Sequence, residues 1–214
     1  MLKMKKLATR EAWLEARGRR IGGSDAAALL GLNPWKNNVE LWEEKTGRRE
    51  PEDIGDKPCV KYGNAAEPLI RHMYTLDHPD MRVIYEDNNL WLDDEKPYAH
   101  ASLDGWLVDM EGRRGVLEIK TSTASSSAAA QKWKGGIPDN YYCQCLHYLL
   151  VTGWDFVDLR ALIRYTDDYA AVRDYRIERA DVLEDIAELE KAEREFYKQL
   201  DSDTPPGLIL PCIQ

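Results

Sequence analysis

The sequence predicts an α/β (or α+β) fold in which a central mixed β-sheet is flanked by helices. The apolar runs 98–109 and 115–120 meet at the turn residues 111–115, which is the pattern of two strands joined by a turn. Runs such as 65–76 and 182–200 carry apolar residues at helical spacing and predict the flanking helices.

The chain length bounds the domain organisation. The 214 residues are enough to bury a substantial core, so one domain over 1–214 is expected. A small helical lobe over 1–60 that contributes part of a phosphate pocket is a variant of this organisation.

In the N-terminal half, helices are predicted at 8–17, 25–30, 38–46 and 65–76. The second helix has the clearest start, because the sequence Gly-Gly-Ser-Asp precedes an Ala- and Leu-rich run that ends at a glycine. Ser24 would cap this helix, and the free amides at its start would favour an anion such as phosphate. Capping alone would also explain Ser24.

In the remainder, strands are predicted at 82–86, 89–92, 98–109 in two pieces, 115–120, 155–163 and 170–177. A helix at 139–152 would have Asp139 as its N-cap, and the last helix at 182–200 has an apolar stripe that would face the core. The segment 122–136 is ambiguous between a loop and a short helix.

Two acidic residues lie where the predicted strand pair would bring them side by side. Asp104 and Glu118, together with the carbonyl of Ile119, are hard oxygen ligands of the kind that Mg²⁺ accepts. Lys120 shares the strand face of Glu118, so it would hold or help to deprotonate a water that attacks a phosphoryl group. This pattern indicates phosphodiester hydrolysis. The alternative interpretation is a solvated ion pair that stabilises the fold by about 0–1 kcal/mol and has no catalytic role.

Other polar residues have a functional interpretation only if they lie next to such a centre. Glu67 lies in a helical run, where an acid would otherwise face solvent. Tyr141 and Gln144 are three residues apart and share one helix face, where a glutamine would otherwise be a packing or surface residue. The segment Lys132-Trp133-Lys134 fits an ordinary amphipathic surface as well as a DNA contact.

At this point the sequence resembles the lambda-exonuclease-like, or YqaJ-like, viral recombinases (alkaline exonucleases) of the PD-(D/E)xK nuclease superfamily. The resemblance covers about residues 13–153. Its motifs occur in the family's order: Trp13 with Arg17, Ile21-Gly22-Gly23-Ser24, Asn33-Pro34-Trp35, Leu41-Trp42-Glu43-Glu44-Lys45-Thr46-Gly47, Gly63 with Glu67-Pro68, Ser102-Leu103-Asp104-Gly105, Leu117-Glu118-Ile119-Lys120, and Tyr141 with Gln144. Leu103 departs from the superfamily's proline, which restrains the backbone but binds no metal.

The resemblance implies a restriction-endonuclease-like core and a function. A Mg²⁺-dependent exonuclease, with Mn²⁺ as a substitute, would digest one strand of duplex DNA 5′ to 3′ to 5′-mononucleotides and leave a 3′ overhang. Alternatives are a structure-specific or restriction-like endonuclease with the same metal site, and a non-catalytic accessory protein that binds DNA ends. The setting would be phage or prophage recombination, with a single-strand-annealing protein as partner and a homotrimeric ring around the DNA.

The resemblance also implies residue roles. Asp104, Glu118 and the Ile119 carbonyl would be metal ligands, Lys120 the catalytic lysine, and Glu67 the helix-borne acid that supports the metal and the water. The pocket for the terminal 5′ phosphate would be formed by Arg17, Ser24, Ser102 and Gln144, with Tyr141 in support.

The overall composition is less informative. The net charge of −9 disfavours DNA binding over the whole surface, but residues 1–20 carry seven Lys or Arg against two Glu, while residues 181–203 carry nine acids against three bases. Cys59, Cys143, Cys145 and Cys212 lack cluster spacing, so neither an iron–sulfur cluster nor a structural zinc is expected. With no apolar span or signal-peptide pattern, the expected location is the cytoplasm of a bacterial host.

Overall fold

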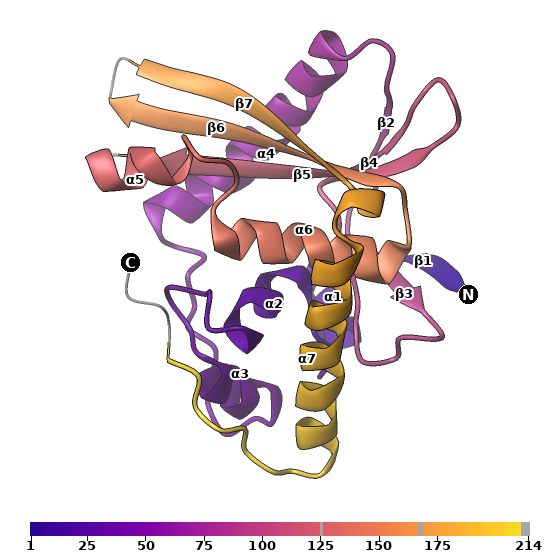
Figure 1. The fold of residues 1–214 in the computed structure, drawn as a ribbon, viewed down its shortest axis with the longest axis vertical. Coiled ribbons are helices and arrows are strands. Elements are labelled where there is room, and N and C mark those ends of the chain that lie inside the picture. The colour runs from indigo at the N-terminus through magenta and orange to yellow at the C-terminus, as the bar shows by residue number, and fades with distance from the viewer. Residues whose placement is uncertain (125, 167–168, 211–214) are drawn as a thin grey trace.

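A five-stranded mixed sheet lies at the centre of the structure, a computed structural model that describes residues 1–124, 126–166 and 169–210. Its strands, in spatial order, are β2 (Arg82–Ile84), β4 (Gly105–Val108), β5 (Arg114–Thr123), β6 (Phe156–Thr166) and β7 (Tyr169–Glu178). The pair β5 and β6 is parallel, and the other neighbours are antiparallel. The predicted mixed sheet flanked by helices is therefore confirmed (Figure 1).

Helices cover both faces of this sheet. On one face, Ile70 and Tyr74 of α4 (Pro58–Asp77) pack with Leu117 of β5 in a compact apolar cluster. On the other face, α6 (Asp139–Thr152) packs against β5 and β6 in the main core. Successive residues of β5 therefore point to different cores, which requires a helix on each side.

The N-terminal helices and the last helix form a layer next to α6 (Figure 1). This layer contains α1 (Arg10–Arg17), α2 (Gly23–Leu29), α3 (Asn38–Lys45) and α7 (Leu183–Asp201). Buried alanines of α2 and apolar residues of α7 belong to the same core as β6. A two-stranded sheet, β1 (Leu2–Lys6) with β3 (Asn89–Asp93), and the short elements α5 (Ser127–Lys132) and η1 (Arg179–Asp181) complete the fold.

Several predicted boundaries were wrong, each for a physical reason. Helix α4 begins at Pro58, not near residue 65, because a proline is accommodated at the first helical position and the first turns are polar and exposed. Strand β1 was not predicted. The piece 98–104 makes only isolated bridges through Ala99 and Ala101 instead of a strand.

Two predicted helix starts also differ. Gly22, not Ser24, is the N-cap of α2, and the Asp25 carboxylate accepts a hydrogen bond from the Gly22 N–H at 3.0 Å. Asp139 is the first residue within α6, and Pro138 is the cap residue. In neither helix does the cap residue itself provide a capping side chain: at α2 the side chain that binds the cap is that of Asp25, and the cap of α6 is a proline.

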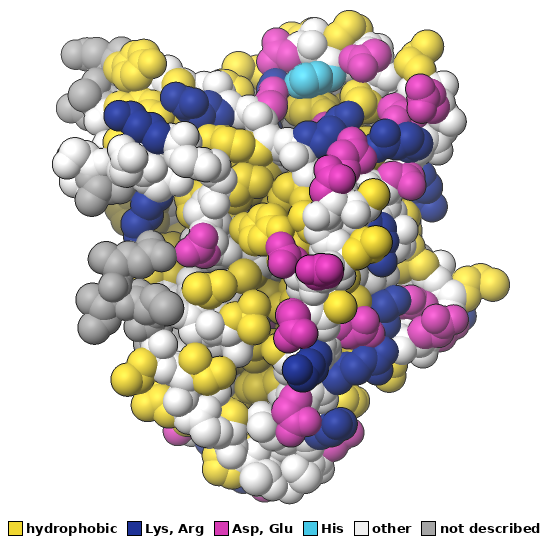
Figure 2. All heavy atoms as spheres, viewed as in Figure 1, with side chains coloured by type: hydrophobic (Ala, Val, Ile, Leu, Met, Phe, Trp, Pro, Cys, Tyr) yellow, Lys and Arg dark blue, Asp and Glu magenta, His cyan; other side chains and the backbone are white. Residues whose placement is uncertain are grey.

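The acidic C-terminal segment is a solvated helix face. Figure 2 shows Asp and Glu side chains, interspersed with Lys and Arg, along the exposed side of α7. Among the described residues, no helix is sufficiently long and apolar to cross a membrane.

Candidate active site

The antiparallel pair β4 and β5 brings two carboxylates together at an open sheet edge. The register places Gly105 opposite Leu117, so Asp104 and Glu118 lie next to each other as predicted. Strand β4 does not extend beyond this pair, and the freed N–H of Ile119 donates to Asp104 Oδ2 at 2.8 Å. Because the N–H and C=O of one strand residue point to the same side, the Ile119 carbonyl is directed towards the same edge.

Glu118 is buried, and one of its oxygens has no partner. Its side chain is 1% exposed, and Oε1 accepts from Gln144 Nε2 at 2.7 Å and from Lys120 Nζ at 2.5 Å. Oε2 has no hydrogen-bond partner among the described residues. A buried carboxylate oxygen without a partner is costly, so its presence beside Asp104 indicates a binding position for a cation.

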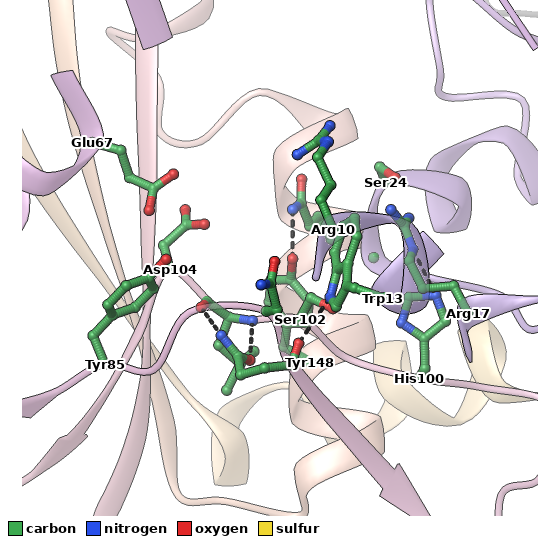
Figure 3. A pocket seen from close by; sticks show the side chains of 15 residues that line it. Arg10, Trp13, Arg17, Ser24, Glu67, Tyr85, His100, Ser102, Asp104 and Tyr148 are labelled. Carbon is green, nitrogen blue, oxygen red and sulfur yellow. Dashed lines mark hydrogen bonds between the residues drawn. The ribbon is translucent and has the colours of Figure 1, made fainter. Parts of the chain in front are cut away.

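Glu67 of α4 faces the Asp104 carboxylate (Figure 3), and it lines one cavity with Asp104 and Glu118. Its carboxylate pairs with Arg71, and the Arg71 Nε also donates to the Asp104 carbonyl at 2.5 Å. Burial and the nearby Asp104 raise the pKa of Glu67 to about 7, and the same two causes raise the pKa of Glu118 to about 8. The Asp104 carboxylate raises the pKa of both Glu67 and Glu118, so these acids form a site that favours positive charge.

The donor set fits a hard divalent cation. Within the described ranges, no group of three His, Cys, Asp or Glu side chains is placed to hold a metal ion by itself. Two carboxylates and a backbone carbonyl leave room for waters and a substrate phosphate, which is how Mg²⁺ is commonly held. Asp104 and Glu118 would hold the ion, with Glu67 next to it.

Lys120 remains a cation in this environment. Burial alone would lower the pKa of its amine, but the carboxylates of Glu118 and Asp104 outweigh burial and raise the pKa above its ordinary value. The ammonium group also lies over the ring of Tyr141, 5.0 Å from its centroid. A group that stays protonated donates hydrogen bonds, so Lys120 is suited to hold a water or a phosphate oxygen.

Asn89 supplies a backbone restraint next to Asp104. Its side chain is 4% exposed; Oδ1 accepts from the Leu103 N–H at 2.9 Å, and Nδ2 donates to the Leu103 carbonyl at 2.8 Å. Both main-chain groups of the residue before Asp104 are thereby fixed. The main chain immediately before Asp104 is therefore restrained by a side-chain amide on β3.

A second group of residues lines a cavity of about 280 Å³ on the other side of Asp104, which we call the arginine cavity. It contains the predicted phosphate residues Arg17, Ser24, Ser102 and Gln144. The Arg17 guanidinium lies over the Trp13 ring at 4.4 Å, and its Nε donates to His100 Nε2 at 3.3 Å. Burial and Arg17 lower the pKa of His100 well below its ordinary value, so this ring stays neutral and can accept.

The hydroxyls of the arginine cavity are oriented towards it. Trp13 Nε1 donates to Ser102 Oγ at 3.1 Å, which leaves the Ser102 hydroxyl proton for a ligand (Figure 3). Ser24 is exposed in the first turn of α2. A side chain at Gly22 would approach His100 Cε1 within 2.8 Å, so glycine is required where this turn passes the ring.

Gln144 lies between the two groups and not with the phosphate residues alone. Its amide nitrogen donates to Glu118 and, at 2.7 Å, to the Tyr148 hydroxyl, so its two donors are occupied. Neither donor of Gln144 is therefore available to a ligand of the arginine cavity, and the bond to Glu118 orients that carboxylate. The other polar side chains of the predicted phosphate pocket are Arg17, Ser24 and Ser102.

A cavity of about 270 Å³, the lysine cavity, adjoins the carboxylates from the other direction. It shares Glu67, Asp104 and Gln144 with the arginine cavity and adds Lys120 and Thr121. The acidic centre thus lies between two cavities, of which one contains Arg17 and the other Lys120.

Sequence reasoning missed Arg10, Asn89, Tyr148 and the orienting role of His100. A signal existed for Arg10, because Arg10, Trp13 and Arg17 follow the i, i+3, i+7 spacing of one helix face. Its guanidinium lies over the Trp13 ring at 5.8 Å. For Asn89 the only signal was an amide within an otherwise apolar strand.

Comparison with known proteins agrees with this geometry. Residues 12–155 match the family described as "YqaJ-like viral recombinase domain", which is more than half of the chain. The chain belongs to this family. Over 149 residues it is 30% identical to the "Uncharacterized protein YqaJ" of Bacillus subtilis (strain 168), a match that covers 69% of this chain and 44% of that relative. The YqaJ-like chain described here therefore spans less than half the length of its relative.

Solved structures show the same fold. The alkaline exonuclease LHK-Exo from Laribacter hongkongensis is similar with a TM-score of 0.68 and 24% identity, over 90% of this chain and 93% of that chain. A phage-related exonuclease from Haemophilus somnus 129PT is similar with a TM-score of 0.56 and 13% identity, over 86% and 96% of the two chains. The restriction-endonuclease-like core expected for a YqaJ-like protein is confirmed.

The buried acids predict a pH-dependent stability for the metal-free protein. Because the pKa values of Glu67 and Glu118 are about 7 and 8 in the folded state and ordinary when unfolded, the folded state binds more protons between about pH 4.5 and 8. The free energy of unfolding should therefore fall as pH rises from 5 to 8.5, by a few kcal/mol. Thermal melting in EDTA checks this, and Mg²⁺ should restore the loss at pH 8.5. A melting temperature that rises steadily over this pH range would contradict the assignment.

Proposed function

We propose that this protein is a divalent-cation-dependent exonuclease that digests one strand of linear duplex DNA in the 5′-to-3′ direction. The proposal depends on one observation: Oε2 of the buried Glu118 has no hydrogen-bond partner among the described residues. This carboxylate lies next to Asp104, which lines both the arginine cavity with Arg17 and the lysine cavity with Lys120. The alkaline exonuclease and the phage-related exonuclease with a similar fold support the same activity.

Each residue of the acidic centre has a separate role in the proposed reaction. Asp104, Glu118 and the Ile119 carbonyl would hold Mg²⁺, or Mn²⁺ in its place, which would supply Lewis-acid polarisation of the scissile phosphate and a more acidic water. Lys120 donates to the attacking water or to a phosphate oxygen and so holds it in line. Glu67, with a pKa of about 7, is suited to accept the proton of that water near neutral pH.

The arginine cavity explains digestion from an end. If the terminal 5′ phosphate must bind to Arg17, Ser24 and Ser102, the scissile phosphate is the next one along the strand, and one 5′-mononucleotide leaves per cycle. An internal phosphate is flanked by chain on both sides, so it would need more room beside Trp13 and His100 than a terminal phosphate does. The products would be mononucleotides and a 3′ overhang.

The wider role follows from the family. We propose that the overhang serves phage or prophage recombination in a bacterial cytoplasm and is passed to a single-strand-annealing protein. A homotrimeric ring around the DNA would make digestion processive. Both features belong to the proposal.

The test is digestion of end-labelled linear duplex, with and without a 5′ phosphate, beside a covalently closed circle, in Mg²⁺ and in EDTA. Metal-dependent release of mononucleotides from the 5′-phosphorylated strand, with the circle intact, is the expected result. A nicked or linearised circle would instead support a restriction-like endonuclease with the same metal site. Binding of ends without any cleavage would support a non-catalytic accessory protein.

Arg17→Ala is expected to reduce the preference for 5′-phosphorylated over 5′-hydroxyl ends. Charge-assisted hydrogen bonds to a phosphate contribute about 1.5–3 kcal/mol, so kcat/KM on phosphorylated ends should fall roughly 10- to 100-fold while hydroxyl ends change little. Arg82→Ala, at an exposed arginine of β2, is the matched control. Equal losses on both kinds of end would contradict the pocket assignment.

A further inference from the structure

A third cavity, the largest of the three at about 680 Å³, lies beside the lysine cavity and has no role in the function proposed above. The two cavities share Cys59 and Thr121. Since the lysine cavity shares Asp104 with the arginine cavity, the three cavities are neighbours in the order arginine, lysine, then this one, which we call the aromatic cavity.

The walls of the aromatic cavity carry aromatic rings that face water. Trp35 is 76% exposed and Tyr62 is 41% exposed, which are high values for side chains of this size. The loop that presents Trp35 is ordered by Asn33, whose Oδ1 accepts from the Trp35 N–H at 2.9 Å and from the Lys36 N–H at 3.2 Å. Tyr141 forms a further part of the wall and connects it to Lys120.

The polar groups of the aromatic cavity are donors and cations. Arg164 lies over the Tyr62 ring at 5.1 Å, and three consecutive hydroxyl residues at the end of β5, residues 121–123, line the same space. None of the described residues that line it is acidic, although the chain has a net charge of −9. Stacking rings with a nearby guanidinium and no carboxylate are the features of single-strand nucleic acid sites.

The order of the cavities decides which nucleotides would reach this space. With the 5′ phosphate in the arginine cavity and the scissile phosphate at Asp104 and Glu118, the lysine cavity is the neighbouring space on the far side of the carboxylates and offers the strand a path. The nucleotides on the 3′ side of the scissile bond then arrive at Trp35, Tyr62 and Arg164.

We propose that the aromatic cavity binds the nucleotides on the 3′ side of the scissile phosphate in the strand being digested. Their bases stack on Trp35 and Tyr62, and Arg164 pairs with a phosphate. This inference rests on the proposed function and adds a substrate site to it: the cavity separates the digested strand from its complement before each cut and keeps it bound between cuts.

The first measurement uses a 5′-phosphorylated duplex with 2-aminopurine at the third nucleotide of the digested strand, in EDTA, with saturating protein. Stacking on an indole quenches this base, so the complex with Trp35→Ala should be several-fold brighter than the wild-type complex. Trp35→Phe should retain most of the quenching, because it keeps an aromatic face. A probe at the opposite position of the complementary strand should not respond to Trp35.

The second measurement is kcat/KM in Mg²⁺ on the same duplex. Trp35→Ala should lower kcat/KM about 5- to 100-fold, because stacking of a base contributes about that factor. Arg164→Ala should lower it over the same range, because it removes a charged partner of a phosphate. In both variants the preference for phosphorylated ends should stay as in the wild type. Met110→Ala, at an 85% exposed side chain of the β4–β5 turn, and Arg82→Ala are matched controls.

The outcomes separate the two proposals. If the wild type does not hydrolyse linear DNA, the proposed function fails. If it does, but Trp35→Ala leaves both the 2-aminopurine signal and kcat/KM within twofold of the wild type, the aromatic cavity is not a strand site. A response of the complementary-strand probe alone would likewise overturn the assignment.

Discussion

Replacement of Lys120 by alanine is expected to lower kcat by about 10²- to 10⁴-fold and to leave binding of duplex ends within a fewfold of the wild type. The reason is that the Lys120 ammonium lies in the lysine cavity, while the function proposed above places the terminal phosphate at Arg17, in the arginine cavity. Single-turnover hydrolysis in Mg²⁺ and fluorescence anisotropy of a labelled duplex in EDTA measure the two effects separately.

The folding consequence of Lys120→Ala must be separated from the catalytic one. The substitution leaves Glu118 buried without its cation, which destabilises a protein by about 3–5 kcal/mol when the charge persists. The Lys120 side chain is 19% exposed, and Lys120→Arg keeps a cation beside Glu118 but changes the position of its donors. This variant should fold, and its kcat should be at least tenfold lower than that of the wild type. Lys191→Ala, on the exposed face of α7, is the control. Full activity in Lys120→Arg would show that only the charge is needed.

Periodicity predicted most of the elements because each buries one face or both faces. The stripe Ile70 and Tyr74 of α4 is an example, since both residues lie in the core beneath β5. The first two turns of α4 were missed because they contact little and carry no apolar stripe. The piece 98–104 has strand-like composition, but its backbone bridges to Ile21 and Trp91 and forms no continuous ladder.

Within the site, local sequence predicted what one hairpin brings together. Asp104, Glu118 and Lys120 are separated by a single turn, so strand register alone determines their proximity. Asn89 and His100 act through the tertiary structure. His147 of α6 donates through Nε2 to the His100 carbonyl at 2.8 Å, and this contact joins segments that no spacing rule connects.

The acidic centre also illustrates the tension between stability and function. A metal-free site with three converging acids is destabilising, and evolution retains such sites where a ligand compensates for them. The same residues should therefore be unfavourable for folding in EDTA and indispensable for hydrolysis. A substitution that removes one charge without changing shape tests both statements at once.

Asp104→Asn is that substitution. The asparagine oxygen can still accept the Ile119 N–H that Asp104 Oδ2 accepts at 2.8 Å, so the hairpin geometry should persist. Burial and Asp104 raise the pKa of Glu118 to about 8, so removal of the Asp104 charge should lower the pKa of Glu118 and raise the melting temperature in EDTA at pH 8 by several degrees.

Hydrolysis by Asp104→Asn should fall by roughly 10³-fold or more, because a lost metal ligand removes several kcal/mol of transition-state stabilisation. The Mg²⁺-induced rise in melting temperature should disappear with it. Asp181→Asn, an exposed acid of η1, provides a matched control that should change neither property. A variant that loses activity but also melts lower in EDTA would indicate that Asp104 serves the fold, whereas higher stability combined with lost hydrolysis is the result that a cation site requires.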